Sequence, residues 1–172
     1  MKKLPENFAL KRLHNVKTDF AERIRDSYEH KAKSCLTCDT KGACCLDAHF
    51  VNVHITRLEA VAIRRVLGRF SDEKRAEIYG RIEETIAKYD LASGGDTFAK
   101  TYACPLFEKG TGCLVHNEGK PLPCIQHACY ERKEDLPPDK MLAEQEGMVE
   151  QLNRRTYSEP AEWRPLPLFI RQ

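Results

Sequence analysis

Eight cysteines, gathered in two short stretches, constrain the fold of this chain more than any other feature. The first stretch holds Cys35, Cys38, Cys44 and Cys45, and the second holds Cys104, Cys113, Cys124 and Cys129. Both stretches are rich in glycine, proline or polar residues, so their thiols do not follow the pattern of an apolar core. Thiolates are preferred ligands of zinc and iron. The pattern therefore predicts that all eight cysteines are metal ligands.

The cellular compartment decides between metal ligation and disulfides. The 172-residue chain has a charged fraction of 31% and no apolar run long enough for a membrane span. Its N-terminus lacks the apolar segment of a secretory signal, so we expect a cytoplasmic protein whose cysteines stay reduced. The formal net charge of +2 does not favour nucleic-acid binding. We expect neither a membrane nor a nucleic acid as a partner.

Helical spacing predicts a mainly α fold. We expect four or so helices around a cysteine-rich metal core, with long irregular loops held by the metal and little or no β structure. Apolar residues at steps of three and four predict helices over about residues 7–33, 57–67 and 72–92, and a last helix after Pro138. A capping box at Thr56 and Glu59, and an N-cap at Ser71, predict where two of these helices begin.

The apolar faces of three of these helices predict which side chains enter the core. They are Leu13, Val16, Phe20, Ile24 and Tyr28 in the first helix, Ala76, Tyr79, Ile82, Ile86 and Tyr89 in the third, and Met141 or Leu142, Gln145, Met148, Val149 and Leu152 in the last. The charged residues between them, Lys17 among these, are expected on the solvent side.

The C-terminal tail, from Glu162 to Ile170, is apolar and interrupted by prolines. Proline disfavours helix interiors and central strands, so the tail is predicted to be neither. We expect it to pack on its own domain. The alternative is that the tail, or the N-terminal helix, docks on a protein partner. The chain is predicted to form one domain over residues 1–172, with a metal-binding core at 35–129 and extensions at 1–34 and 130–172.

The cysteine pattern resembles that of the bacterial cysteine-cluster proteins of the YkgJ type, known for a CxxCxxCC zinc- or iron-chelating domain. The matching residues are Cys35, Cys38, Gly42, Cys44 and Cys45, the segment from Val51 to Ala60, and the pairs Cys104-Pro105, Gly112-Cys113 and Pro123-Cys124. The chain departs from the family in two places. Five residues separate Cys38 from the double cysteine, whereas the family's shorter form has two at this place. In addition, Leu122-Pro123 stands where the family often has Arg-Pro. The resemblance implies metal binding. A similar cluster in flagellin lysine methylases is associated with an iron–sulfur cluster, which implies modifying chemistry as an alternative.

Zinc in four-thiolate sites and an iron–sulfur cluster both suit these cysteines. Since neighbouring side chains tend to diverge, we expect Cys44 and Cys45 to face different ions, or only one of them to ligate. His116 and His127 are secondary candidates, either as substitute ligands or as hydrogen-bond partners of ligands. Weaker candidates are His49 and His54. The cations expected to balance the thiolate charge are Lys41, Arg57, Lys109, Lys120 and Lys133.

Three classes of function remain open. The first is an accessory or structural module that holds zinc or iron through eight cysteines, an iron–sulfur cluster included. The second is an iron–sulfur metalloenzyme or a redox component of a system that modifies proteins or peptides. The third is a zinc-stabilised regulator. The sequence contains no Ser-His-Asp set, phosphate-binding loop or HExxH. Catalytic residues therefore stay unassigned, and the first class is preferred.

Overall fold

The computed structural model describes residues 2–33, 40, 42–46 and 52–171. Within this part the chain is mainly helical, with helices α1 to α6 and strands of only two residues each, which confirms the mainly α prediction. The chain forms two compact units. Unit 1 combines Met1–Lys41 with Lys120–Ala161, and unit 2 combines Gly42–Gly119 with Glu162–Gln172. The organisation as one domain with two extensions stays a prediction.

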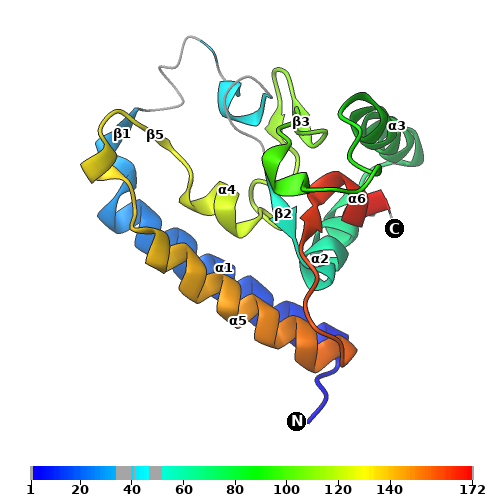
Figure 1. The fold of residues 1–172 in the computed structure, drawn as a ribbon, viewed down its shortest axis with the longest axis horizontal. Coiled ribbons are helices and arrows are strands. Elements are labelled where there is room, and N and C mark those ends of the chain that lie inside the picture. Colours follow the sequence, from blue (N-terminus) through cyan, green and yellow to red (C-terminus); the bar gives the residue numbers. More distant parts are fainter. Residues whose placement is uncertain (1, 34–39, 41, 47–51, 172) are drawn as a thin grey trace. The chain divides into compact units, whose positions relative to one another are not determined.

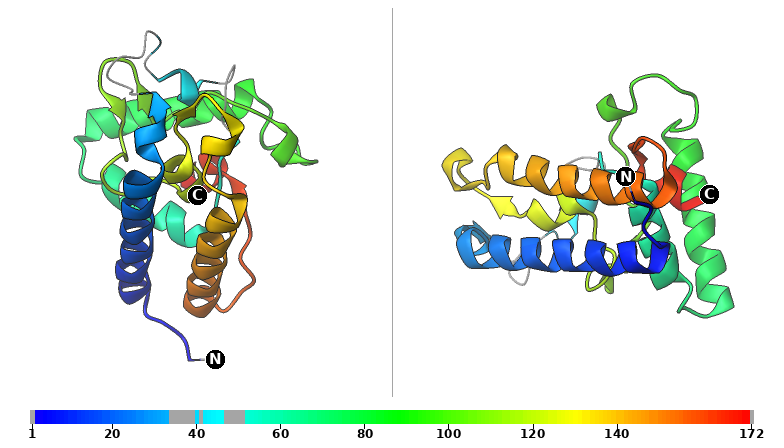
Figure 2. Two further views of the ribbon diagram at one scale, coloured as in Figure 1. Left: turned by 90° about the vertical axis from the view of Figure 1, so that its left-hand side faces the viewer. Right: turned by 90° about the horizontal axis from the view of Figure 1, so that it is seen from below.

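In unit 1, two long helices lie side by side and run in opposite directions: α1 (Glu6–Ser27) and α5 (Asp139–Tyr157) (Figures 1 and 2). Hydrogen bonds connect the start of α1 with the end of α5. The Leu4 backbone N–H donates to the Arg155 carbonyl over 2.9 Å, and the Tyr157 hydroxyl donates to a Glu6 carboxylate oxygen over 2.9 Å. The expected helix over residues 7–33 is therefore present, but it ends at Ser27.

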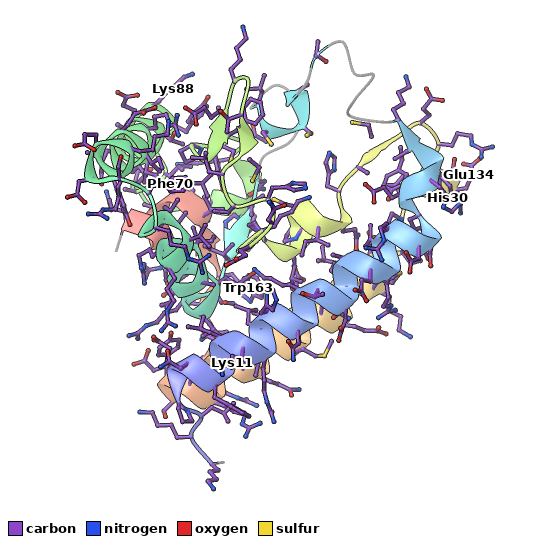
Figure 3. The ribbon with its side chains drawn as sticks, turned by 180° about the vertical axis from the view of Figure 1, so that it is seen from behind. Lys11, His30, Phe70, Lys88, Glu134 and Trp163 are labelled. Carbon is purple, nitrogen blue, oxygen red and sulfur yellow. The ribbon has the colours of Figure 1, made fainter. Side chains whose placement is uncertain are left out.

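The buried faces of these two helices differ in part from the predicted ones. Buried positions are Ala9, Leu13, Lys17, Phe20 and Ile24 on α1, and Gln145, Val149, Leu152, Asn153 and Thr156 on α5. Lys17, expected in solvent, is only 7% exposed, whereas Met148, expected in the core, is 40% exposed. Both errors concern the edge of an apolar stripe, where one helical position, about 100° of rotation, decides burial. The outer face of α1 carries charged side chains such as Lys11 (Figure 3).

A short helix and a two-stranded pairing complete unit 1. The helix α4 (Leu122–Gln126) packs on both α1 and α5. The strand β1 (Ala32–Lys33) pairs antiparallel with β5 (Cys129–Tyr130). This pairing places Lys33 opposite Cys129, so the chain that continues towards the first cysteine stretch leaves from beside the last cysteine of the second.

In unit 2, the helices α2 (Arg57–Leu67) and α3 (Asp72–Lys88) begin at the predicted residues. The Thr56 hydroxyl oxygen accepts from the Glu59 backbone N–H, and a Glu59 carboxylate oxygen accepts from the Thr56 N–H, which confirms the capping box. The Ser71 side chain accepts from the Lys74 N–H and caps α3. The buried residues of α3 are Ile78, Ile82, Thr85 and Ile86. Ala76, expected in the core, is exposed, because the stripe passes through Ile78 instead.

The C-terminal tail is regular, contrary to the prediction. The strand β6 (Arg164–Pro165) pairs antiparallel with β2 (His54–Ile55), and a helix, α6 (Leu166–Arg171), follows directly. Pro167 lies in the first turn of α6, where backbone N–H groups have no intrahelical partner and proline is tolerated. Leu166, Phe169 and Ile170 are buried, and α6 packs on α2 and α3. The expectation that the tail packs on its own unit is confirmed.

No helix within the described residues is both long enough and apolar enough to cross a membrane.

Candidate functional site

A single tight turn presents the double cysteine of unit 2. Gly42 has a φ of +84° and precedes a 3-10 turn, η3 (Ala43–Cys45), in which the Cys45 N–H donates to the Gly42 carbonyl over 2.8 Å. This left-handed backbone is open to glycine and costly for other residues. A Cβ at position 42 would also overlap the Phe107 ring. Glycine is therefore required here for two independent reasons.

A hairpin presents two further cysteines beside this turn. The strands β3 (Phe107–Glu108) and β4 (Gly112–Cys113) pair antiparallel, with Phe107 opposite Cys113. Cys104 lies three residues before β3 begins, and its backbone N–H donates to the Cys45 carbonyl over 2.8 Å. Residues about sixty positions apart in the sequence are thereby joined through their backbones.

The thiols of these two segments interact with one another. A hydrogen bond with the Cys44 side chain raises the pKa of the Cys45 thiol far above its ordinary value, and partial burial and the neighbouring Cys104 and Cys113 raise it further. Burial raises the pKa of the Cys104 thiol to about 12, and Cys113 adds to this rise. We call Cys44, Cys45, Cys104 and Cys113 the unit 2 cysteine group.

Two hydrogen-bond donors and one charge oppose the rise of the Cys104 pKa. These are the backbone hydrogen bonds from Leu106 and Phe107 and the positive charge of Arg81. Each favours the charged form of the sulfur. The surroundings of Cys104 thus hold a neutral thiol in the absence of a counter-ion, and they already contain groups that stabilise a thiolate.

All six described cysteines are thiols and not disulfides, and each is half-buried. Across residues 2–33, 40, 42–46 and 52–171, no three or more His, Cys, Asp or Glu side chains are grouped so that they could hold a metal ion as they stand. In unit 2 the thiols nevertheless interact, and those of Cys44 and Cys45 share a hydrogen bond. Protonated thiols can hydrogen-bond to one another, because the S–H group is a weak donor and sulfur a weak acceptor.

The remaining cysteines fall in unit 1. Cys124 lies on α4, and Cys129 begins β5 opposite Lys33. The sequence range of unit 1 also includes Cys35 and Cys38, two further predicted ligands. Both lie outside the described residues. The eight cysteines therefore divide four and four between the units, with two taken from each sequence stretch. We call Cys35, Cys38, Cys124 and Cys129 the unit 1 cysteine group.

The candidate histidines have different surroundings. The His116 N–H donates to the Cys113 carbonyl over 3.1 Å, so this residue closes the turn after the hairpin. His127 follows α4, and partial desolvation and the charge of Lys120 lower its pKa. His49 is outside the described residues. His54 is buried, with its Nε2 2.9 Å from the Thr97 hydroxyl and its ring stacked on Phe98 at 3.8 Å. His54 thus has a packing role in unit 2.

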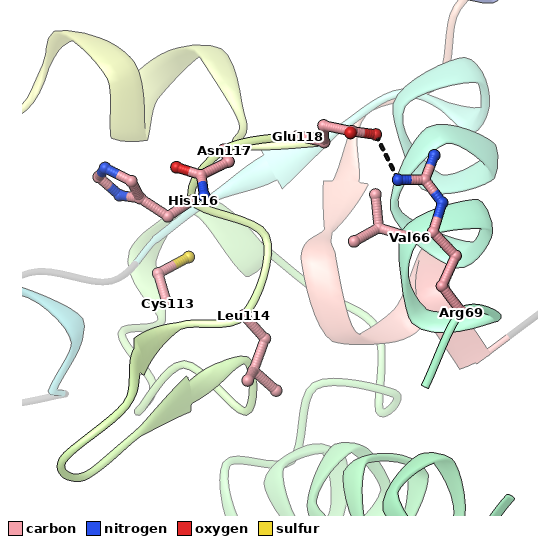
Figure 4. Close-up of a pocket in the computed structure, with 7 residues that line it drawn as sticks. All are labelled: Val66, Arg69, Cys113, Leu114, His116, Asn117 and Glu118. Carbon is pink, nitrogen blue, oxygen red and sulfur yellow. Dashed lines mark hydrogen bonds and ion pairs between the residues drawn. The ribbon is translucent and has the colours of Figure 1, made fainter. Parts of the chain in front are cut away.

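A pocket of about 210 Å³ lies beside the hairpin (Figure 4). It is lined by Val66, Arg69, Cys113, Leu114, His116, Asn117 and Glu118. Cys113 ends β4 and His116 lies in the turn that follows, and an ion pair of 2.7 Å between Arg69, two residues after α2, and Glu118 joins the end of this helix to the same turn. The pocket therefore borders one member of the unit 2 cysteine group.

A cation that acts on one of the described thiols was not among the predicted ones. Lys41 is outside the described residues, whereas Lys109, Arg57 and Lys133 are exposed. The charge that acts on Cys104 is that of Arg81, on α3. Helical periodicity places Arg81 on the polar part of α3, and nothing in the sequence links this residue to a cysteine that follows it by 23 positions. Only the packing of α3 near the hairpin brings the two together.

A comparison of the chain with protein-family models, with curated proteins and with solved structures gives no match.

Proposed function

We propose that this chain is a metal-binding protein that holds zinc or iron, an iron–sulfur cluster included, through two four-cysteine groups. Our preferred role is that of an accessory or structural metal module. One observation carries the proposal: Cys44 and Cys45 meet Cys104 and Cys113 in unit 2, where the Cys104 N–H binds the Cys45 carbonyl. Four thiols that arrive on two separate loops match the donor set of a closed four-coordinate zinc site.

The donors around Cys104 support the proposal independently of the cysteine count. Backbone N–H groups that hydrogen-bond to a sulfur stabilise the thiolate, which is the form that binds metal. Leu106 and Phe107 supply such bonds, because the chain turns into the hairpin directly after Pro105. A cysteine that served only as a small apolar side chain would gain nothing from these donors.

The second proposed metal site is that of unit 1. Cys124 and Cys129 are described, and Lys33, two positions before Cys35 in the sequence, pairs with Cys129. Both cysteines of an adjacent pair, Cys44 and Cys45, then belong to one ion in unit 2. The interaction of the Cys45 thiol with Cys44, Cys104 and Cys113 supports this assignment. The alternative stays that the two cysteines face different ions, or that only one of them ligates.

Metal binding would have a large effect on stability. Structural zinc contributes roughly 10–16 kcal/mol of apparent binding free energy at neutral pH. The net stability of a domain is about 5–15 kcal/mol. We therefore expect the loops that carry the cysteines to lose their order when the metal is removed, while the α1/α5 pair, built from apolar contacts, persists.

The test is anaerobic purification followed by metal analysis, assay of acid-labile sulfide and a visible spectrum. Two zinc ions per chain in a colourless protein would identify two thiolate zinc sites. Iron with sulfide in a brown protein would identify an iron–sulfur cluster. A protein that binds neither zinc nor iron after anaerobic reconstitution, and whose thermal unfolding a chelator leaves unchanged, would overturn the proposal.

A further inference from the structure

The last described residues, 162–171, belong to unit 2, although the helix before them, α5, belongs to unit 1. We call residues 162–171 the tail segment. Its strand β6 pairs with β2, and the Leu166 backbone N–H extends this pairing by donating to the Val53 carbonyl over 2.9 Å. The tail segment therefore adds a strand to residues that precede it by most of the length of the chain.

The helix α6 of the tail segment is held on α2 and α3 (Figure 1). Arg64 on α2 donates from its Nη1 to the Phe169 carbonyl over 2.7 Å, which satisfies a carbonyl near the C-terminal end of α6. The Arg171 Nη1 lies 3.6 Å from a Glu83 carboxylate oxygen on α3, and Ile170 is fully buried. Unit 2 thus has a surface that fits the tail segment in backbone pairing, apolar contact and charge.

The same surface fits the tail segment of a second copy of the chain equally well, because the two tail segments are identical. Exchange of an identical element between two copies is a low-cost route to a dimer, since the contacts that each chain gives up within itself are regained with its partner. The difference in free energy between the closed and the exchanged form then lies mainly in the connection that precedes the tail segment.

That connection is short and strained. The helix α5 ends at Tyr157, and β6 begins at Arg164. Directly after α5, Ser158 has a φ of +63° and a ψ of 22°, a left-handed conformation that disfavours a residue with a Cβ by a factor of roughly 5–30. Pro160 favours an extended backbone at Glu159, and both residues are exposed. Short connections under strain favour exchange, because opening the connection releases the strain.

We propose that two copies of this chain exchange their tail segments, so that the tail segment of each completes unit 2 of the other. The partner is a second copy of this chain, and the docking surface is β2 together with α2 and α3. This inference goes beyond the proposed metal-binding function and does not depend on it. A short linker gives a tethered segment an effective concentration in the millimolar range. We therefore expect the exchanged dimer to become populated as the protein concentration rises towards that range.

The first test measures the molar mass of the full-length chain by size-exclusion chromatography with light scattering, from about 10 µM to about 1 mM. A phosphine reductant keeps the described cysteines as thiols, as they are in the structure. Ser158→Gly removes the strain of the closed form, since glycine adopts a positive φ readily. Ser158→Pro forbids the closed form's backbone, since proline fixes φ near −65°. Circular dichroism checks that each variant keeps its helix content.

Asp90→Gly is the matched control for Ser158→Gly. Among the described residues, Asp90 and Ser158 are the two with a side chain and a positive φ, and Asp90 lies within unit 2, outside the connection. We expect Ser158→Gly to raise the dissociation constant of the dimer by at least about fivefold, and Ser158→Pro to lower it by at least as much. Asp90→Gly should leave it unchanged.

The second test distinguishes exchange from side-by-side contact. Arg171→Lys places an amine close to the Glu83 carboxylate, and a carbodiimide couples an amine to a carboxylate that it contacts. The variant is prepared with ¹⁴N and with ¹⁵N, and equal amounts are mixed in urea and refolded together. In exchanged dimers, about half of the cross-links between positions 171 and 83 should join a light peptide to a heavy one, because the two copies pair at random. The monomer fraction, in which every such cross-link lies within one chain, is the control.

Three results would overturn the inference. The first is a wild-type chain that stays monomeric up to about 1 mM, well into the effective concentration of the linker. The second is a dimer whose cross-links between positions 171 and 83 all join peptides of the same isotope. The third is a dimer whose dissociation constant Ser158→Gly leaves unchanged, and this result decides even where Ser158→Pro does not fold.

Discussion

The backbone N–H of Cys104 donates to the carbonyl oxygen of Cys45 over 2.8 Å. This bond joins the tight turn after Gly42 to the loop that enters the β3–β4 hairpin, and the side chains of both cysteines lie in the same group of thiols. The two stretches that look like separate clusters in the sequence each contribute half of this group.

The division of the cysteines between two units predicts independent metal sites. Cys104→Ser should lose the metal of unit 2 and keep that of unit 1, whereas Cys124→Ser should show the reverse, because a serine hydroxyl is a poor ligand for a soft metal. Metal content per chain, measured after anaerobic purification of each variant, checks this. A single substitution that removed all metal from a chain of unchanged helix content would contradict the assignment of four cysteines to each site.

Gly42 is predicted to be intolerant of any side chain. Gly42→Ala should destabilise the protein by more than the roughly 1–2 kcal/mol of a left-handed residue with a Cβ, since the added carbon also meets the Phe107 ring. The measurement is urea unfolding. Gly80→Ala is the matched control, because Gly80 lies on α3 and a Cβ added there would have no atom within 4 Å. This control should gain about 0.5–1 kcal/mol from helix propensity. Equal effects of the two substitutions would refute the explanation.

The stability of unit 2 should depend on pH through His54. Burial lowers the pKa of this imidazole below its ordinary 6.5, against the smaller opposing effects of the Asn52 carbonyl and Asp96. The unfolded chain therefore takes up the proton first. The contribution of His54 is complete above pH 6.5 and is lost as the pH falls through the lower, folded-state pKa.

The check compares the melting temperature of the wild type with that of His54→Gln between pH 7.5 and pH 5. We expect the wild type to lose more stability over this interval than the variant, although the variant starts lower because it lacks the stacking on Phe98. The difference between the two curves isolates His54 from every other group that titrates. Parallel curves would show that His54 does not titrate in this interval.

The tail should contribute to the core of unit 2. Ile170 is fully buried on α6, and Ile170→Ala should cost about 2–5 kcal/mol, the usual effect of removing a large buried aliphatic side chain. Met148→Ala, at a position that is 40% exposed, should change the free energy of unfolding by no more than about 0.5 kcal/mol. Chemical denaturation of both variants tests the prediction. A tail that contributed little would give similar values for the two.

Local features of the fold could be predicted because their causes lie within a few residues. The Thr56 hydroxyl and the Glu59 carboxylate satisfy backbone groups three positions away, so the start of α2 needs no information from the rest of the chain. The same holds for the Ser71 cap of α3. The tail was the exception. Its prolines argued against a helix, but Pro167 sits in the first turn of α6, where a missing N–H is harmless.

Burial at the edges of the helices could not be predicted from periodicity. Lys17 is buried and Met148 is exposed because each lies where the apolar stripe ends, and the partner helix decides which side of that border is covered. Ala76 is a different case, because it lies about 200° of helical rotation from the buried Ile78 and so on the exposed side of α3. A hydrophobic pattern gives the direction of a face, whereas its width depends on what packs against it.

The sequence by itself determined the presence of the four long helices, the caps of α2 and α3, and the eight thiols, because local hydrogen bonds and side-chain periodicity need no distant contact. Only the tertiary structure decided which thiols meet. It placed Cys104 and Cys113 beside Cys44 and Cys45, Cys129 opposite Lys33, and Arg81 near Cys104. Such pairings depend on where α3 and the hairpin pack, a balance of long-range contacts that spacing along the chain does not encode.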